Sequence, residues 1–578
     1  MRWIKKITWW QLLLIFLILA IASMGPQIVK QTMYMNSWDV PFHLSRMYEL
    51  TKGFENGKWL PDISAYTFGQ NGYGVNLFYG YSFTYLVALI YFWTHQAITA
   101  VLAGYIILLT TAMGLNYYAG SLFFTGGRSK LKSFAFSTLY VLAPVTFGQI
   151  KVRGLPGELI GILLFPAVLA AFYAIMFTAR KSWVFASIVS TITVTNHVLS
   201  ALLLLIVLTI MFIVFLYKKQ ATTGKLWQLV KAGILTLLLS AFYVMPFIQQ
   251  ILSDKIAGAN VFFQATSVWD SISSSISNQA TLNWTAIPVG VFVFVMSIVV
   301  VLGLLYTRSF SNHVQIIGGW LAISLIAIFY TPIEILTKTP LHVFQMMGRF
   351  YPIIMLLGLL FVIEGLERFS EIGLLKQKTV GWLFVTGIVL AIFSAWKMQV
   401  TTYYNGGSAN IANYQVGKKQ LPKTVSNSDF DYQIQHYYQL PLGSKDYLGQ
   451  GRVKFVNNYQ VGSWGDNRDA KRIYIDGKLS SLQLTHKGYV FTVANVPTSS
   501  KQVLLPMTNY KGWQVIGANN KILPITTIKG KMAVDPKGNR TLHLTYHKTL
   551  LHRVAIMVSA ISVVALLVVG LMTYFKRR

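Results

Sequence analysis

The stretch that decides the fold is W-W-Q-L-L-L-I-F-L-I-L-A-I-A-S-M-G-P-Q-I-V, residues 9 to 29. An apolar run of this length predicts a helix that crosses the roughly 30 Å hydrocarbon core of a bilayer. Arg2, Lys5 and Lys6 precede it, so the positive-inside rule predicts that the helix starts in the cytoplasm. No small-residue cleavage site follows before Lys30, so we expect a retained anchor rather than a signal peptide.

The residues after this helix bring three reactive groups to the predicted outer surface of the membrane. They read W-D-V-P-F-H-L-S-R, residues 38 to 46, and include Asp39, His43 and Arg46. In a helix, His43 lies four positions after Asp39 and shares its face. The arrangement therefore predicts chemistry in this loop. Two structural alternatives stay open, namely Asp39 as a helix N-cap before Pro41 and His43 as an interfacial hydrogen-bonding residue.

The composition of the whole chain predicts a polytopic membrane protein. Of its 578 residues, 54% are hydrophobic and only 12% are charged, and the mean hydropathy is +0.51. These values exclude a soluble globular protein. The chain has no cysteine, which excludes disulfides, thiol nucleophiles and thiolate metal sites.

Apolar windows of about 17 to 23 residues predict about twelve transmembrane helices, counting the first one. Few ionisable side chains fall inside them, and the main candidate, Glu364, lies near the predicted cytoplasmic end of its helix. Ion-coupled carriers need such groups near the midplane, and no inverted repeat is evident, so a secondary transporter is disfavoured. The eleven other windows are residues 96–118, 133–150, 158–177, 182–196, 197–217, 229–247, 287–306, 314–330, 350–365, 379–396 and 553–574.

One further apolar stretch, residues 77–93, is predicted to be a helix that lies in, or re-enters, the outer membrane interface. It is rich in Phe, Tyr and Trp, whose rings prefer the headgroup level. A thirteenth crossing would place many basic residues outside, against the positive-inside rule. These residues are Arg128, Lys130, Lys132, Arg180, Lys181, Lys218, Lys219, Lys576, Arg577 and Arg578. A short ordinary span with the remainder inverted stays open as the alternative.

The pattern predicts three parts. Residues 1–397 form a transmembrane module whose first exterior loop, 30–95, holds the interfacial helix. Residues 398–550 form an extracellular, mainly β domain, and residues 551–578 form the last transmembrane helix with a basic cytoplasmic tail. Strand-like alternation between turn signals predicts a small antiparallel β-sandwich. The alternating runs are residues 472–475, 489–493, 503–507, 513–516 and 541–546.

The predicted exterior domain is strongly basic. Residues 398–550 contain nineteen lysines and arginines against seven aspartates, a formal charge of +12. Outside a cell this charge favours anionic wall polymers such as teichoic acid, or anionic lipid headgroups, over nucleic acid. Simple solvation is the alternative. Asp429-Phe430-Asp431 has the spacing of the acidic metal motif of nucleotide-sugar enzymes, but it lacks the alternating strand and helix pattern of those enzymes, and we interpret it as a chance match.

No Walker motif or dinucleotide glycine motif occurs, so we expect any sugar donor to be carried by a lipid. Polar residues gather instead at the predicted outer ends of helices. If the bundle closes, these ends are expected to surround one cavity under the loop that carries Asp39. The residues are Arg153 and Glu158 around the turn 154–157, Asn196 and His197 at a hairpin, and Gln345 and Arg349 before the helix at Phe350.

Several motifs appear together in a characteristic order. They are D-x-x-x-H at 39–43, the aromatic segment, V-R-G-L-P-G-E at 152–158, N-H-V-L-S-A-L-L at 196–203, Q-M-M-G-R-F at 345–350 and L-P-M-T-N-Y-K-G-W-Q-V at 505–515. With these motifs the chain resembles the bacterial integral membrane family labelled 6-pyruvoyl-tetrahydropterin-synthase-related. That family is close to the YfhO-type proteins and similar to the GT-C glycosyltransferases. The ten dispersed histidines do not show the zinc-binding set of the soluble synthase.

The resemblance implies a transferase that moves a sugar from a polyprenyl-phosphate carrier to a cell-envelope acceptor on the outer face. It places an acid of the first exterior loop at the reaction centre, and Asp39 matches. A carboxylate there acts either as the base for an acceptor hydroxyl or as the ligand of a divalent cation, Mg²⁺ or Mn²⁺. His43 would orient the carboxylate or the acceptor. Glu49, Glu55 and Asp62 are the other candidates for the base.

Cationic helix ends are the candidates for binding the donor phosphate. A guanidinium matches phosphate oxygens in bidentate geometry, so Arg349 is the leading residue, with Arg153 and Gln345 beside it. Arg46, Glu158 and His197 are further candidates. The structural alternatives are a snorkelling Arg349, an Arg153–Glu158 pair across the turn, and a His197 that only caps its hairpin.

Three classes of function stay open at this point. The first is the lipid-linked sugar transferase. The second is a non-enzymatic accessory protein that binds wall polymer through its basic exterior domain. The third is a flippase for a lipid-linked glycan. The scarcity of charged residues in the predicted membrane helices is compatible with a flippase but does not indicate one.

Overall fold

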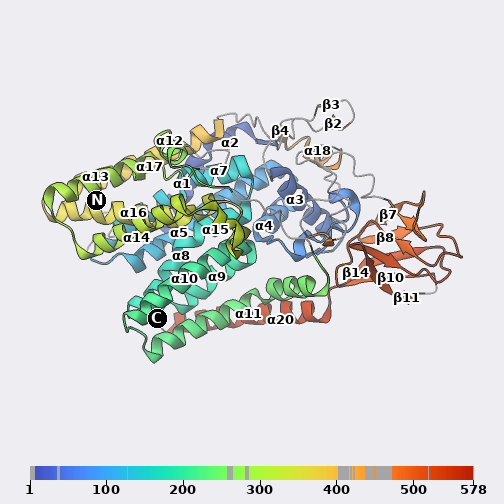
Figure 1. The fold of residues 1–578 in the computed structure, drawn as a ribbon. Helices are drawn as coiled ribbons and strands as arrows, with labels where there is room; N and C mark the ends of the chain where they lie inside the picture. Colours follow the sequence, from blue (N-terminus) through green and yellow to red (C-terminus); the bar gives the residue numbers. More distant parts are fainter. Residues whose placement is uncertain are drawn as a thin grey trace. The chain divides into compact units, whose positions relative to one another are not determined.

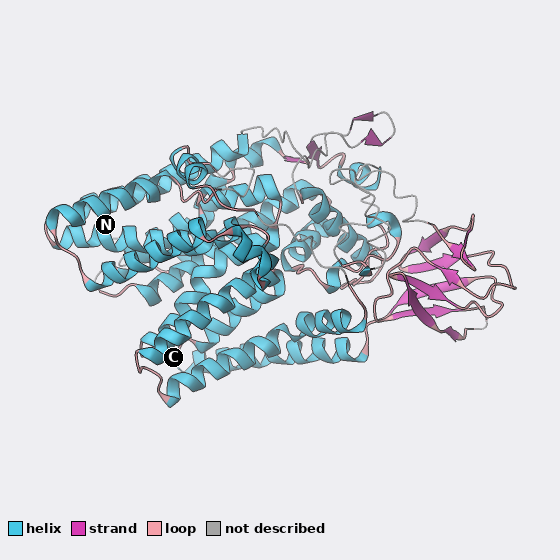
Figure 2. Cartoon of the chain, in the orientation of Figure 1, coloured by secondary structure: helices cyan, strands magenta, loops and turns pink. Residues whose placement is uncertain are grey.

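A computed structural model describes residues 7–35, 39–126, 128–256, 264–279, 286–400, 415–416, 419–420, 424–436, 447–450, 472–518 and 520–576. Helices make up most of these residues, and most of the strands belong to one β-rich region (Figure 2). Contacts group the chain into two compact units. Unit 1 comprises Met1–Gln31, Val101–Ile234 and Val261–Tyr404, and unit 2 comprises Thr32–Ala100, Leu235–Asn260 and Asn405–Arg578.

In the described residues, nine helical segments are long and apolar enough to cross a membrane. They are α5 (Ala97–Phe123), Ser129–Arg153 with α6 (Ser129–Val141), α7 (Pro144–Gly148) and η4 (Gln149–Arg153), α8 (Pro156–Phe177), α10 (Val198–Tyr217), α11 (Thr223–Ser253), α14 (Asn312–Tyr330), Met347–Glu371 with η6 (Met347–Phe350) and α16 (Tyr351–Glu371), α17 (Gln377–Val400) and α20 (Leu550–Lys576).

Four shorter apolar helices complete this set, namely α1 (Trp9–Ser23), α4 (Ser82–Thr94), α9 (Trp183–Asn196) and α13 (Val291–Thr307). Each of the twelve predicted windows falls on one of the thirteen apolar segments (Figure 1). The prediction of a polytopic helical membrane protein is therefore confirmed. The sidedness of the helices stays a prediction.

Unit 1 is a helical bundle with one continuous apolar core. Buried side chains of α5, α6, α8, α9, α10, α13, α14, α16 and α17 belong to the same cluster. Close packing of α8 on α10 depends on Gly161, because an added Cβ would lie 2.2 Å from Ser200 Oγ. Short elements border the bundle: α2 (Gly25–Lys30), α12 (Val268–Ile276), α15 (Ile333–Lys338) and η5 (Pro340–Phe344).

Two ion pairs fix the start of α6 to the last turns of α16. Lys132 Nζ lies 2.8 Å from Glu364 Oε1, and Arg128 Nη2 lies 2.6 Å from Glu367 Oε1. Glu364, the main intramembrane acid considered for ion coupling, is thus held by a lysine. The Lys132–Glu364 pair is a direct, charge-assisted hydrogen bond between largely buried side chains, so we interpret Glu364 as a structural residue.

Unit 2 contains an antiparallel β-sandwich. One sheet has the strand order β11-β10-β14-β8-β7 and the other has the order β12-β13-β9-β5-β6. Their inward side chains, among them Phe491, Val515 and Leu544 from the first sheet and Val503 and Met532 from the second, share one apolar core. The sandwich precedes α20, so the prediction of a mainly β region before the last helix is confirmed.

Every predicted strand run contains a strand, namely β5 (Tyr474–Ile475), β8 (Val490–Val493), β9 (Val503–Leu504), β10 (Trp513–Ile516) and β14 (Leu542–Tyr546). The turn Asp476-Gly477 joins β5 to β6, with both residues at positive φ as a two-residue type I′ hairpin requires. Sequence reasoning missed β6 (Lys478–Leu479), β7 (Leu484–Lys487), β11 (Ile522–Leu523), β12 (Ile525–Ile528) and β13 (Lys531–Val534).

The first loop folds into unit 2 and joins the sandwich core. Ile63, Ala65, Leu77 and Phe78 are buried in the same cluster as the strand residues. The loop begins with β1 (Thr32–Tyr34), which pairs with β4 (Thr424–Ser426). It then forms α3 (Val40–Glu55), η2 (Phe68–Gln70), η3 (Val75–Leu77) and α4.

Helix α4 matches the predicted helix in 77–93 from Ser82 onward. With 13 residues it is roughly 20 Å long, which is too short to cross a bilayer unaided.

In the rest of unit 2, the second half of α11 lies beside α20 (Figure 1), where Phe242 N donates to Ser559 Oγ at 3.0 Å. The described part of 398–450 adds β2 (Gln415–Val416), β3 (Lys419–Gln420) and α18 (Phe430–His436).

Candidate functional site

A buried cluster in unit 1 places two arginines around one glutamate. Arg153 Nη1 lies 3.3 Å from Glu158 Oε1 and 3.4 Å from Oε2. Arg349 Nε lies 3.6 Å from Glu158 Oε2. The side chains of Arg153, Glu158 and Arg349 are 4%, 3% and 13% exposed. The Arg153–Glu158 pair across the turn was the structural alternative in the sequence, and the structure contains it with Arg349 as a third member.

A break between two helices builds the first half of this cluster. The π-helix η4 ends at Arg153, Gly154 follows with φ of +65°, and Pro156 starts α8. Glycine adopts the left-handed conformation at little cost, and proline at the first helical position suits a helix start. Glu158 then lies in the first turn of α8, where the helix dipole favours a negative charge.

The second half of the cluster comes from the segment before α16. Gln345 has φ of +62°, and its carbonyl accepts a hydrogen bond from Gln264 N at 2.9 Å. Arg349 Nη1 donates to Gln345 Oε1 at 2.8 Å and to Phe344 O at 3.0 Å. Arg153 Nη2 contacts Met346 Sδ at 3.3 Å. The structure therefore brings together four of the predicted site residues, namely Arg153, Glu158, Gln345 and Arg349.

His197 caps the N-terminus of α10. Its Nδ1 accepts a hydrogen bond from Ser200 N at 3.2 Å and lies 2.8 Å from Ser200 Oγ. A ring nitrogen that accepts from a backbone N–H carries no proton, so the imidazole is neutral in this arrangement. The capping role that the sequence offered as an alternative is therefore the one that the contacts show.

Among the described residues, the cluster contains more positive than negative side chains. Arg153 and Arg349 carry two positive charges against the single negative charge of Glu158, and His197 adds none. A buried excess positive charge is costly unless an anion or water compensates it. In the described part of the chain, the hydrogen bonds of Arg349 use Nη1, which leaves Nη2 for another acceptor.

Asp39, His43 and Arg46 lie in unit 2, on the start of α3. Asp39 occupies the N-cap position of α3, but its side chain makes no capping hydrogen bond. His43 N donates to Asp39 O at 3.0 Å, so the predicted spacing of four positions in a helix is present. The His43 ring is buried beside Phe42 and Tyr79, with ring centroids 5.1 and 5.4 Å away. Asp39 itself is half-buried.

Arg46 is 1% exposed and has no carboxylate partner among the described residues. Its Nη2 donates to Asn76 Oδ1 at 3.0 Å and to the carbonyls of Tyr79 and Gly80 at 3.1 Å each. The guanidinium also lies 5.0 Å from the centroid of the Tyr79 ring. Burial lowers the pKa of Arg46. Its Nε and Nη1 are buried and make no hydrogen bond with the described residues.

Glu49 has a structural environment. Its Oε1 accepts from Ala65 N at 2.9 Å and Tyr489 OH at 2.8 Å, and its Oε2 accepts from Tyr66 N, Thr67 N and Thr67 Oγ1, each at 2.9 Å. Burial raises the pKa of the Glu49 carboxyl, and these five hydrogen bonds oppose that rise by stabilising the charged form. The contacts tie α3 to the sandwich and leave little room for a substrate.

The remaining acids considered for the base also have partners. Asp62 pairs with Lys548, and Glu55 lies 2.8 Å from Lys52 Nζ. In the Asp429-Phe430-Asp431 motif, Asp429 Oδ1 accepts from Ser426 N at 2.7 Å, while Asp431 accepts from the Tyr91 hydroxyl. The two carboxylates thus serve different local contacts. Among the described residues, no group of three or more His, Asp or Glu side chains is arranged to hold a metal ion.

Sequence reasoning missed the residues that surround Arg46. Asn76 and Tyr79 lie in the run N-L-F-Y-G, residues 76–80, which the sequence marked only for its aromatic content. The signal available was a glycine after a cluster of aromatic and amide residues, which predicts a turn and not a guanidinium site.

Comparisons with known proteins give one structural similarity. No protein-family model matches the chain, and no curated protein matches its sequence. The cryo-electron microscopy structure of the arabinofuranosyltransferase AftD from mycobacteria is similar over 72% of this chain, with 13% sequence identity and a TM-score of 0.43. This chain covers 28% of that protein. Similarity at this level establishes neither a family nor an activity.

Proposed function

We propose that this protein is a membrane glycosyltransferase of the GT-C type. It moves a sugar from a polyprenyl-phosphate donor to a cell-envelope acceptor on the outer face of the membrane. The observation that carries the proposal is the buried cluster of Arg153 and Arg349 around Glu158, in which Arg349 Nη2 makes no hydrogen bond with the described residues.

A phosphate group is the ligand that this cluster fits best. Guanidinium groups bind phosphate oxygens through charge-assisted hydrogen bonds, and Arg349 Nη2 makes none with the described residues. Glu158 contacts both arginines, so it competes with the phosphate for their hydrogen bonds.

The chemistry of transfer needs a base for the acceptor hydroxyl and stabilisation of the departing phosphate. Arg349 and Arg153 supply the stabilisation, since positive charge near a leaving phosphate lowers the barrier to its departure. The family resemblance implies an acid of the first loop at the reaction centre, and in this proposal Asp39 is the base, with His43 orienting the carboxylate or the acceptor. A divalent cation at Asp39 is the alternative role for the same carboxylate.

The test uses the full-length protein in lipid nanodiscs and a panel of polyprenyl-phosphate monosaccharides, with cell-envelope material as acceptor. The expected result is release of polyprenyl phosphate, detected by mass spectrometry, which requires both acceptor and Arg349. The variant Arg368→Gln is the matched control, because Arg368 also lies on the α16 segment but pairs with the exposed Glu371.

Three outcomes would count against the proposal. Equal release by wild type and Arg349→Gln would remove the cluster from the reaction. Transport of the polyprenyl-linked sugar across a liposome membrane in the absence of acceptor would favour a flippase. Binding of wall polymer without release of polyprenyl phosphate would favour an accessory protein.

A further inference from the structure

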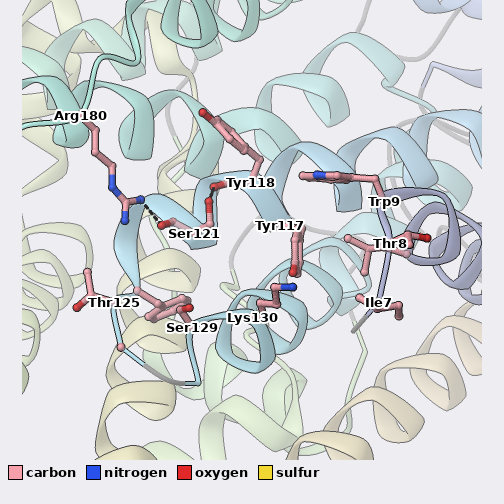
Figure 3. A pocket seen from close by; sticks show the side chains of 13 residues that line it. Ile7, Thr8, Trp9, Tyr117, Tyr118, Ser121, Thr125, Ser129, Lys130 and Arg180 are labelled. Atoms are coloured by element: carbon pink, nitrogen blue, oxygen red, sulfur yellow. Dashed lines mark hydrogen bonds between the residues drawn. The ribbon is translucent and has the colours of Figure 1, made fainter. Parts of the chain in front are cut away.

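A cavity of about 550 Å³ lies in unit 1 beside the first turn of α1, and its described lining includes no residue of the arginine cluster. Its walls come from the start of α1, the last turns of α5, the start of α6 and the segment after α8 (Figure 3). Among the residues that the structure describes, no acidic one lines it. The lining residues with polar or charged side chains are Thr8, Trp9, Tyr117, Tyr118, Ser121, Thr125, Ser129, Lys130 and Arg180.

Two helices begin at this cavity. Thr8 is the N-cap of α1 and accepts a hydrogen bond from Gln11 N at 3.4 Å. Ser129 and Lys130 are the first two residues of α6. The first turn of a helix carries a partial positive charge, so two such starts at one cavity favour an anion.

Two basic side chains add full charges to the same space. Arg180 Nη1 donates to the carbonyl of Ser121, and its other guanidinium nitrogens make no hydrogen bond with the described residues. Lys130 points toward Tyr117 in the cavity (Figure 3). A guanidinium, an ammonium and nearby hydroxyl groups form a set of donors that suits phosphate oxygens.

The opening of the cavity has an aromatic and apolar side. Trp9 is 52% exposed, and its ring lies 5.6 Å from the ring of Tyr117 at an interplanar angle of 86°. Leu12 lines the cavity, and Trp10 and Leu14 on the same helix are exposed at 83% and 56%. Tryptophan and tyrosine favour the headgroup level of a bilayer. The ligand is thus expected to carry acyl chains next to its phosphate.

We propose that this cavity binds the phosphate headgroup of an anionic glycerophospholipid. The positive-inside rule assigns this end of the bundle to the cytoplasmic leaflet, in which anionic lipids attract basic residues. The lipid bridges the starts of α1 and α6 and the segment after α8. This site is independent of the proposed transferase function.

The experiment measures retention of phosphatidylglycerol and phosphatidylcholine on the purified full-length protein by native mass spectrometry. The double variant Lys130→Gln/Arg180→Gln is compared with Lys218→Gln/Lys219→Gln, which removes the same charge from exposed residues outside the cavity. We expect about thirtyfold weaker retention of phosphatidylglycerol in the first variant, since each basic residue contributes about fivefold. The control variant keeps wild-type retention.

Three results would overturn the proposal: equal phosphatidylglycerol retention in both double variants, phosphatidylcholine retained as tightly as phosphatidylglycerol, or displacement of the lipid by an equal concentration of glycerol phosphate. The last result would assign the cavity to a soluble phosphate. Should the double variant fail to fold, the exposed Arg180→Gln alone is expected to weaken retention about fivefold, and unchanged retention in that variant is equally decisive.

Discussion

Arg349 Nε lies 3.6 Å from Glu158 Oε2, and this contact joins the segment before α16 to the first turn of α8. Because Arg153 holds the other side of the same carboxylate, Glu158 fixes two guanidinium groups at once. Among the described residues this arrangement places two guanidinium groups on one carboxylate, which suits an anion as a further ligand.

Substitution of Arg349 is expected to weaken binding of the donor phosphate. Arg349→Gln should lower the affinity for undecaprenyl phosphate by about ten- to hundredfold, because hydrogen bonds between charged groups contribute about 1.5 to 3 kcal/mol each. Arg349→Lys should restore part of the affinity, since an ammonium keeps the charge without the bidentate geometry. Fluorescence titration of the protein in nanodiscs with undecaprenyl phosphate measures the affinity. Unchanged affinity in Arg349→Gln, with Arg368→Gln as the control, would exclude this residue.

Substitution of Glu158 is expected to move stability and phosphate binding in opposite directions. Glu158→Gln leaves two buried arginines without a carboxylate, which should cost about 3 to 5 kcal/mol of folding free energy. The same change raises the net charge of the cluster, so affinity for undecaprenyl phosphate should rise. Thermal unfolding with and without the lipid tests both.

The double variant Arg153→Gln/Glu158→Gln provides the control for this prediction. Its loss of stability should be smaller than the sum of the two single losses, because the two side chains interact directly. Additive losses of stability would show that the direct contact between Arg153 and Glu158 contributes no free energy of its own. A fall in phosphate affinity in Glu158→Gln would show instead that the carboxylate is needed to orient the arginines.

The sequence predicted what depends on local pattern. Apolar length located every long helix, and the Arg153–Glu158 pair followed from a glycine–proline turn between them. The approach of Arg349 to Glu158 depends on how α8 and α16 pack, which no local pattern encodes. The same holds for Glu49, whose five donors come from residues 65–67 and Tyr489. Among the missed strands, β13 is buried at all four positions, so its sequence shows no alternation of apolar and polar residues.

Substitution of Asp39 is expected to remove sugar transfer with little effect on folding. Asp39→Asn keeps the shape of the side chain but removes the base, and general-base catalysis contributes about 10²- to 10⁴-fold to rate. Folding should persist because asparagine keeps the size of this half-buried side chain. Release of polyprenyl phosphate and thermal unfolding measure the two effects. Activity near wild type would move the base to another residue.

Substitution of Glu49 is expected to weaken unit 2 rather than the reaction itself. Two hydrogen bonds reach Oε1 and three reach Oε2. The amide of Glu49→Gln has one accepting oxygen, so at least two buried donors lose their acceptor. Each such donor costs about 1 to 3 kcal/mol. The unfolding temperature should therefore fall clearly.

The matched control is Glu55→Gln, on the same helix. Glu55 is 40% exposed and pairs only three positions away with Lys52, and exposed pairs contribute about 0.2 to 1 kcal/mol. A Glu49→Gln protein that unfolds like the Glu55→Gln protein but has lost transfer activity would contradict the structural role, because it would show that the reaction needs the Glu49 carboxylate. Equal losses of stability and activity would instead confirm that Glu49 acts by holding α3, and with it Asp39 and His43, against the sandwich.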